Sequence, residues 1–159
     1  MNLSSAQLVE LDDTSLRMRE RIIRLACDGG CFLGASLSAV DTINYLYHHF
    51  LNIQSFDSFS RDYFFLSKGH DVPALYSVFV DLGWLDESRL KNHLSVNDHI
   101  YWHPNTSIAG VEFHSGSLGH LLSVGCGVAL DIKIRGGSQR VVVMTGDGGT
   151  SEGDFHEAL

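Results

Sequence analysis

The chain has 159 residues, enough to bury a hydrophobic core within one domain. Its formal charge of -8 argues against a broad nucleic-acid-binding surface, which would be basic. No apolar run approaches the roughly 20 residues of a membrane span, and the first residues lack the basic start and apolar block of a signal peptide. Three cysteines without a CxxC pair favour a reducing compartment, so we expect a cytoplasmic protein.

Hydrophobic spacing predicts helices that alternate with short apolar runs. Met18, Ile22 and Leu25 recur at helical intervals and predict an amphipathic helix over about residues 13–27, ended by Asp28-Gly29-Gly30. The next expected elements are a helix around residues 40–51, a strand at 62–66, a helix from Pro73 to about Gly83 and a short helix capped by Asp86.

The second half of the chain ends in a strand and a glycine-rich loop. Residues 104–119 predict an ordered loop, and a helix should run from Leu118 to just before Gly136. The apolar run 141–144 (VVVM) is typical of a central parallel strand. This alternation indicates an α/β fold with a parallel sheet, in which ligands bind at the carboxyl ends of the strands.

The loop Gly146-Asp147-Gly148-Gly149 follows that strand and is the first candidate site. Its glycines allow backbone N–H groups to approach an anion, and the Asp147 carboxylate suits Mg²⁺ or Ca²⁺ bridging to a phosphate. A helix starting near Ser151 would point its positive end at the same phosphate. Taken alone, such a loop is more often a plain strand–turn–helix connection in which the aspartate only caps.

Two further glycine-bearing loops support a phosphate site. Residues 114–119 (HSGSLG) precede a helix, and residues 67–70 (SKGH) follow the predicted strand at 62–66. Neither loop is a Walker loop or a complete dinucleotide fingerprint. Because all three loops lie at strand ends or helix starts, together they predict phosphate binding.

His70 and His103 are the histidines most suited to a site, because both lie in loops where a polar side chain can face a cavity. A zinc site that includes His103 is disfavoured by wide spacing and a lack of partner cysteines. Glu152 and Glu157 are five residues apart and do not share a helix face well, so their spacing alone indicates only ordinary helix-start charge.

Three segments, in order, resemble the transketolase family. They are 61–70 (RDYFFLSKGH) with Pro73-Ala74-Leu75-Tyr76, then His103-Pro104 with 110–112 (GVE) and 116–119 (GSLG), then Gly146-Asp147-Gly148 with Glu152-Gly153 and Glu157-Ala158. The resemblance runs from about residue 14 to the C-terminus. It implies that residues 1–159 are part of one diphosphate-binding domain with a thiamine-diphosphate-binding fold. That fold is a three-layer α/β arrangement with a parallel sheet between helices, incomplete at the C-terminus.

The resemblance also implies residue roles. Asp147 would bind the divalent metal, Mg²⁺ or Ca²⁺, and the backbone of Gly146 and Gly148 would contact the diphosphate. The segment Gly116-Ser117-Leu118-Gly119 would line the cofactor, with Leu118 near its aminopyrimidine. His70 and His103 would face the diphosphate and the substrate.

The implied reaction is the transfer of a two-carbon ketol unit from a ketose to an aldose, with a sugar or sugar phosphate as substrate. Glu152 and Glu157 would belong to a carboxylate network at the interface with a pyrimidine-binding partner. The family's cofactor lies between two domains, so an oligomer is expected, and this chain alone is expected to be inactive.

The chain departs from the family pattern at three places. Cys31-Phe32 replaces the usual Gly-His, and phenylalanine can neither bind a sugar hydroxyl nor transfer a proton. His120-Leu121 places a bulky side chain where the family has glycine. Leu159 lies before the asparagine that would complete the metal site, so we expect either a truncated subunit or a site completed by another chain.

Two alternatives stay open. The α subunit of a 2-oxoacid dehydrogenase has a stretch similar to residues 146–159, although residues 67–70 favour transketolase. A non-catalytic interaction module that kept the scaffold would be consistent with Phe32, Leu121 and the early end, whereas Asp147 and the two histidines argue against it.

Overall fold

A computed structural model describes residues 3–56 and 58–159. The main elements are α1 (Ser5–Gly29), α2 (Leu33–Tyr45), β1 (Tyr63–Leu66), α3 (Val72–Asp81), α4 (His120–Ile134), β2 (Val141–Met144) and α5 (Gly153–Glu157). A π-helical turn, Leu46–Phe50, extends α2, and short 3₁₀ turns cover Gly69–Asp71, Glu87–Asn92 and Gly149–Ser151. In the described part of the chain, no helix is long and apolar enough to cross a membrane.

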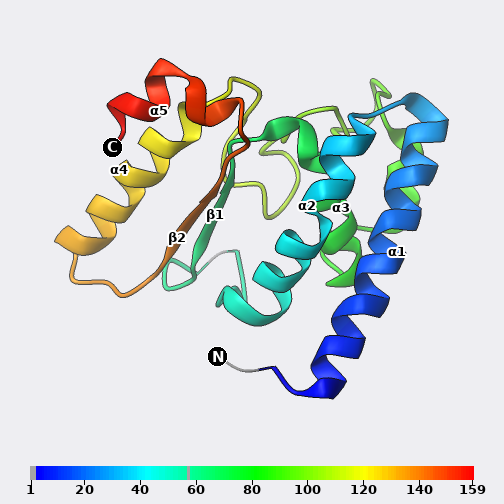
Figure 1. Cartoon of the computed structure of the whole chain (residues 1–159), viewed down its shortest axis with the longest axis horizontal. Helices are drawn as coiled ribbons and strands as arrows, with labels where there is room; N and C mark the ends of the chain where they lie inside the picture. The colour runs from blue at the N-terminus through cyan, green and yellow to red at the C-terminus, as the bar shows by residue number, and fades with distance from the viewer. Residues whose placement is uncertain (1–2, 57) are drawn as a thin grey trace.

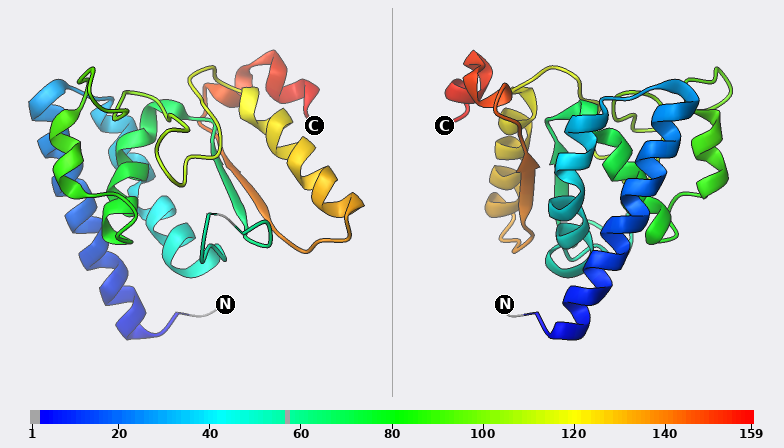
Figure 2. Two further views of the ribbon diagram at one scale, coloured as in Figure 1. Left: turned by 180° about the vertical axis from the view of Figure 1, so that it is seen from behind. Right: turned by 45° about the vertical axis from the view of Figure 1, so that its right-hand side comes forward.

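The two strands pair in parallel and have helices on both faces (Figure 1). Tyr63 lies opposite Val141, and Leu66 lies opposite Met144. Figure 2 shows α4 against one face of the sheet, and α2 and α3 against the other, with α1 outside them. The parallel α/β architecture predicted from the sequence is therefore confirmed.

Alternate residues of each strand pack against different helices. Phe64 and Leu66 join the core formed with α1, α2 and α3. Phe65 and Val143 face α4, where Gly125 leaves room for them: a methyl group on Gly125 would lie 2.5 Å from Val143 Cγ2. β2 was expected to be a central, buried strand, but all four of its residues are only half-buried. Among the described residues, its sole strand partner is β1.

Two helices begin at other residues than the sequence predicted. α1 begins at Ser5, not near residue 13, because Ser4 and Gln7 form a capping box. Ser4 Oγ accepts a hydrogen bond from Gln7 N, and Ser4 N donates one to Gln7 Oε1. The first turns of α1 expose Leu8 and Val9, so they carry no inward-facing apolar pattern. The helix expected near Ser151 begins at Gly153, after a 3₁₀ turn.

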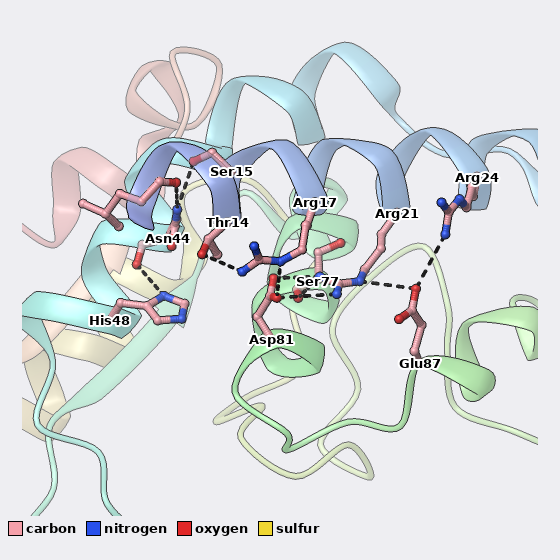
Figure 3. Close-up of polar contacts among 11 residues, drawn as sticks. Thr14, Ser15, Arg17, Arg21, Arg24, Asn44, His48, Ser77, Asp81 and Glu87 are labelled. Carbon is pink, nitrogen blue, oxygen red and sulfur yellow. Dashed lines mark hydrogen bonds and ion pairs between the residues drawn. The ribbon is translucent and has the colours of Figure 1, made fainter. Parts of the chain in front are cut away.

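Polar contacts fix α1 to α2 and α3 (Figure 3). Arg21 Nη1 lies 2.7 Å from Asp81 Oδ2, and both side chains are nearly buried. Asn44 Nδ2 donates to the Leu11 carbonyl (2.8 Å) and to Ser15 Oγ (2.9 Å). Because these partners come from three helices, their contacts fix how α1, α2 and α3 pack against one another.

The segment that leads to His103 is held by Asp98. Arg89 Nη2 (2.6 Å) and Asn92 Nδ2 (3.0 Å) donate to the buried Asp98 carboxylate, and the hydrogen bond from Arg89 holds the pKa of Asp98 well below its usual range. A lowered folded-state pKa stabilises the fold above the unfolded value of about 3.9, and this stabilisation is lost as pH falls. We therefore expect the melting temperature of the wild type to fall more than that of Asp98→Asn between about pH 5 and pH 2. Equal losses, measured by circular dichroism, would contradict this assignment.

Candidate active site

Three loops meet at the carboxyl ends of β1 and β2. The first is 67–70 after β1, the second is 145–149 after β2, and the third is 114–119 before α4. A methyl group on Gly69 would lie 2.5 Å from Ser115 Oγ and 3.1 Å from Gly116 N, so the first and third loops are in direct contact. A methyl group on Gly148 would lie 3.4 Å from Leu118 Cδ1, which places the second loop against the third.

Two further glycines in these loops, Gly119 and Gly146, also have close neighbours. Gly119 has a φ of +82°, and a methyl group there would lie 2.9 Å from Glu152 Cβ. A methyl group on Gly146 would lie 3.0 Å from the Lys68 side chain, which runs along this loop. The predicted residues 116–119 and 146–148 thus lie together at the carboxyl ends of the two strands.

His70 and His103 both lie close to the Phe32 ring. The Phe32 ring centroid is 5.3 Å from that of His70, in an edge-on arrangement, and 6.5 Å from that of His103. A methyl group on Gly116 would lie 3.3 Å from His103 Cδ2, so this histidine also contacts the third loop. The sequence predicted both histidines at the site, and the resemblance placed Phe32 where the family has a histidine; spacing alone gave no sign of these ring contacts.

The two histidines interact electrostatically. Burial lowers the pKa of His103, and the nearby His70 lowers it further. Because a protonated His70 disfavours a second positive charge, His70→Ala should raise the pKa of His103, although burial will keep it below the usual value of about 6.5. Titration of the His103 Hε1 proton by NMR measures this change. An unchanged His103 pKa in the variant would show that the two rings do not interact.

Asp71 and Lys68, the two neighbours of the turn residue pair that includes His70, form a buried ion pair. The sequence analysis did not predict this pair. Lys68 Nζ lies 3.1 Å from Asp71 Oδ2, and the Asp71 side chain is fully buried. Burial raises the pKa of Asp71, against the opposing effect of Lys68. The spacing of lysine and aspartate three residues apart, at a strand end, was the available signal. The pair fixes the turn that presents His70.

Asp147 is exposed at the tip of the second loop. Its backbone carbonyl accepts a hydrogen bond from Thr150 Oγ1 (2.8 Å), which closes the turn and leaves the carboxylate free to bind a ligand. Across residues 3–56 and 58–159, no three His, Cys, Asp or Glu side chains are grouped as a metal site. A cation bound at Asp147 would therefore need ligands other than further His, Cys, Asp or Glu side chains of the described residues.

The two glutamates differ in position. Glu152 is exposed and lies against Gly119, next to the third loop. Glu157 is the last residue of α5 and is also exposed. A pocket of about 280 Å³ opens beside the third loop. It is lined by Phe113, His114, Ser115, Gly116, Ser117, His120 and Leu121.

Known proteins are similar to this chain in sequence and in fold. Residues 24–159 match the family described as transketolase, thiamine diphosphate binding domain. Transketolase-like protein 2 of Homo sapiens is 35% identical over 94% of this chain and 24% of its own length. An apulose-4-phosphate transketolase subunit of Actinobacillus succinogenes is 32% identical over 99% of this chain and 59% of its own length.

Solved structures agree with the family match. Transketolase from Campylobacter jejuni has a TM-score of 0.81 at 28% identity, over 99% of this chain and 26% of that structure. Transketolase from Leishmania mexicana has a TM-score of 0.83 at 22% identity, over 99% of this chain and 25% of that structure, and so supports the fold alone. The chain thus spans between about a quarter and three fifths of the length of these proteins. From sequence and structure together, the chain belongs to the transketolase family, in the region of its thiamine diphosphate binding domain.

Proposed function

We propose that this chain forms the diphosphate-binding part of a thiamine-diphosphate-dependent transketolase and acts with a partner that carries the pyrimidine-binding domain. The observation that carries the proposal is the meeting of three glycine-bearing loops at the carboxyl ends of two parallel strands, where α/β proteins bind phosphorylated ligands. The similarity to a bacterial protein that is itself one subunit of a transketolase supports a divided enzyme. On this proposal, residues 1–159 belong to one three-layer diphosphate-binding domain.

The residues present fit a diphosphate and an aromatic cofactor. Ser67 Oγ and Ser115 Oγ are buried at the first and third loops, and neither has a hydrogen-bond partner within the part of the chain that the structure describes. Such groups need a partner, which a bound ligand or water can supply. The backbone of Gly146 and Gly148 would hold the diphosphate. The segment Gly116-Ser117-Leu118-Gly119 would line the cofactor, with Leu118 toward its aminopyrimidine.

The two histidines would act on the substrate. When bound, thiamine diphosphate supplies a nucleophilic carbon and the electron sink that ketol transfer from a ketose to an aldose requires. His70 and His103 would orient sugar or sugar-phosphate hydroxyls and exchange protons with them. The lowered pKa of His103 favours its neutral form near pH 7, which can accept a proton.

A divalent cation would be shared with the phosphate. Asp147 offers one exposed carboxylate, the hard oxygen ligand that Mg²⁺ or Ca²⁺ prefers, and phosphate oxygens would supply further ligands. Glu152 and Glu157 would face the partner in a carboxylate network, giving an oligomer. The three free cysteines, Cys27, Cys31 and Cys126, are consistent with the cytoplasm.

The alternative of a non-catalytic module has one observation in its favour, the phenyl ring of Phe32 beside the two histidines. Conversely, such a module would have no use for the buried, unpartnered Ser115 hydroxyl at the loop contact. The similarity to transketolase-like protein 2 and to the apulose-4-phosphate transketolase subunit favours a transketolase over a 2-oxoacid dehydrogenase.

Calorimetric titration of thiamine diphosphate with Mg²⁺ tests the proposal. We expect binding when the pyrimidine-domain partner is present and little or none to the chain alone. Asp147→Ala should weaken binding about 10- to 100-fold, because it removes a metal ligand. Asp12→Ala, which changes an exposed aspartate in α1, is the control and should bind as the wild type does. Absence of binding with the partner would favour the non-catalytic module.

A further inference from the structure

Phe32 places an apolar ring next to His70 and His103. It is the N-cap residue of α2, and its side chain is 51% exposed. The hydrophobic core, as far as the described residues form it, does not include Phe32. Phe32 therefore contributes little to packing of the interior, and it is exposed to solvent beside His70 and His103.

The backbone around Phe32 is fixed from two sides. The Gly30 carbonyl accepts hydrogen bonds from Trp102 Nε1 (3.1 Å) and His93 Nε2 (2.9 Å), which tie the turn before Phe32 to the segment leading to His103. Ser36 Oγ donates to the His70 carbonyl (3.4 Å), which ties α2 to the first loop. The backbone that carries the Phe32 ring is thus held close to both histidines, and a ligand that reaches them would meet the ring.

A phenyl ring has no hydrogen-bond donor or acceptor. A substrate hydroxyl placed against it gives up water without a replacement partner, whereas an apolar group gains from contact with the ring. We propose that Phe32 is a specificity-determining residue that selects an acceptor aldehyde with an apolar group, alkyl or aryl, over a hydroxylated one. This inference rests on the proposed ketol transfer. In that reaction the aldehyde carbon gains the carbon–carbon bond that the donor loses, and the aldehyde oxygen takes up a proton.

Propanal and glycolaldehyde test the inference, since they differ by a methyl group in place of a hydroxyl. With the partner, the cofactor and one fixed ketose donor, the wild type should have the higher kcat/KM for propanal. Phe32→His should lower the propanal-to-glycolaldehyde ratio at least about tenfold. Phe32→Leu, which keeps an apolar side chain, should change it by less than about threefold. A wild-type preference for glycolaldehyde, or a ratio unchanged in Phe32→His, would overturn the inference.

A binding measurement separates this inference from the proposed function. We expect benzyl alcohol, added to the chain without cofactor, to shift the NMR Hε1 signals of His70 and His103 more than erythritol does. This difference should vanish in Phe32→His. Equal shifts from the two probes would overturn the inference. Failure of thiamine diphosphate to bind, with the benzyl alcohol effect intact, would count against the proposed function alone.

Discussion

The Gly69→Ala variant should lose about 100-fold in affinity for thiamine diphosphate, because displacing site groups by about 1 Å has effects of that size. The added methyl group would lie 2.5 Å from Ser115 Oγ and 3.1 Å from both Gly116 N and the Ser115 carbonyl carbon. Two of these three atoms belong to the backbone, so rotation of a side chain cannot relieve the clash. The third loop must move away from the first, and overpacking of this kind also destabilises a fold by about 1–3 kcal/mol.

Gly34→Ala is the matched control. Gly34 lies in α2, and no described atom outside its immediate surroundings comes within 4 Å of a methyl group placed there. This variant should bind as the wild type does and should be as stable or up to about 1 kcal/mol more stable, since alanine is the better helix former. Calorimetry with the partner and urea denaturation of the chain alone measure the two effects. Similar affinities for the two variants would show that contact between the loops does not shape the site.

Arg61→Met should be the most destabilising single change at a charged residue. Arg61 and Glu112 form a two-bonded ion pair in which the side chains are 10% and 12% exposed, and the guanidinium lies 4.3 Å from the centre of the Tyr63 ring. Methionine keeps much of the apolar stem but leaves the Glu112 carboxylate buried without its partner. Removal of one member of a buried pair costs about 3–5 kcal/mol. The loss should also loosen residues 104–119, because Glu112 anchors that loop to the start of β1.

The effect of Arg61→Met should depend on pH. Burial raises the pKa of Glu112, and Arg61 opposes that rise, so the pKa should increase further in the variant. An acid with a raised folded-state pKa destabilises the fold above its unfolded value of about 4.3, and the penalty fades as pH falls toward that value. The difference in unfolding free energy from the wild type should therefore be larger at pH 7 than at pH 4.5, as urea titrations would show.

Arg135→Met provides the control for that experiment. Arg135 pairs with Asp131 on the surface of α4, with side chains 77% and 58% exposed. Exposed pairs of this kind contribute little to stability, so the control should be indistinguishable from the wild type at both pH values. If both methionine variants lose the same stability, burial of Glu112 is not the cause.

The sequence predicted the elements best where local spacing decides them. Met18, Ile22 and Leu25 have the spacing of an inward-facing helix, and all three are buried in α1. The run of residues 141–144 is apolar on both sides, and β2 is indeed covered by helices on both faces. The sequence did not predict that β2 pairs with only one strand in the described part of the chain. An apolar run indicates that both faces of a strand are covered, but it does not indicate how many strands pair with it.

The site was predicted in part, for the same reason. Glycine-bearing loops after strands mark a ligand-binding edge, and the structure brings 67–70, 114–119 and 145–149 together there. The contact of Phe32 with His70 and His103 joins residues that are far apart in the chain, and periodicity carries no information on such contacts. Glu157 was placed in the site by resemblance alone, and its role there stays a prediction.

The pairing of the two parallel strands also has a consequence for the order of folding. Asp62 receives hydrogen bonds from Arg140, 78 positions along the chain, at the point where the sheet begins. Closing so long a connection costs conformational entropy before any contact compensates for it, and contacts between distant residues slow folding. The helices α1, α2 and α3 each form from contacts between near neighbours, and the ion pairs from α1 to Asp81 span a shorter 60 to 64 positions. The paired strands, whose carboxyl ends carry the candidate-site loops, should therefore be among the last parts of the chain to form.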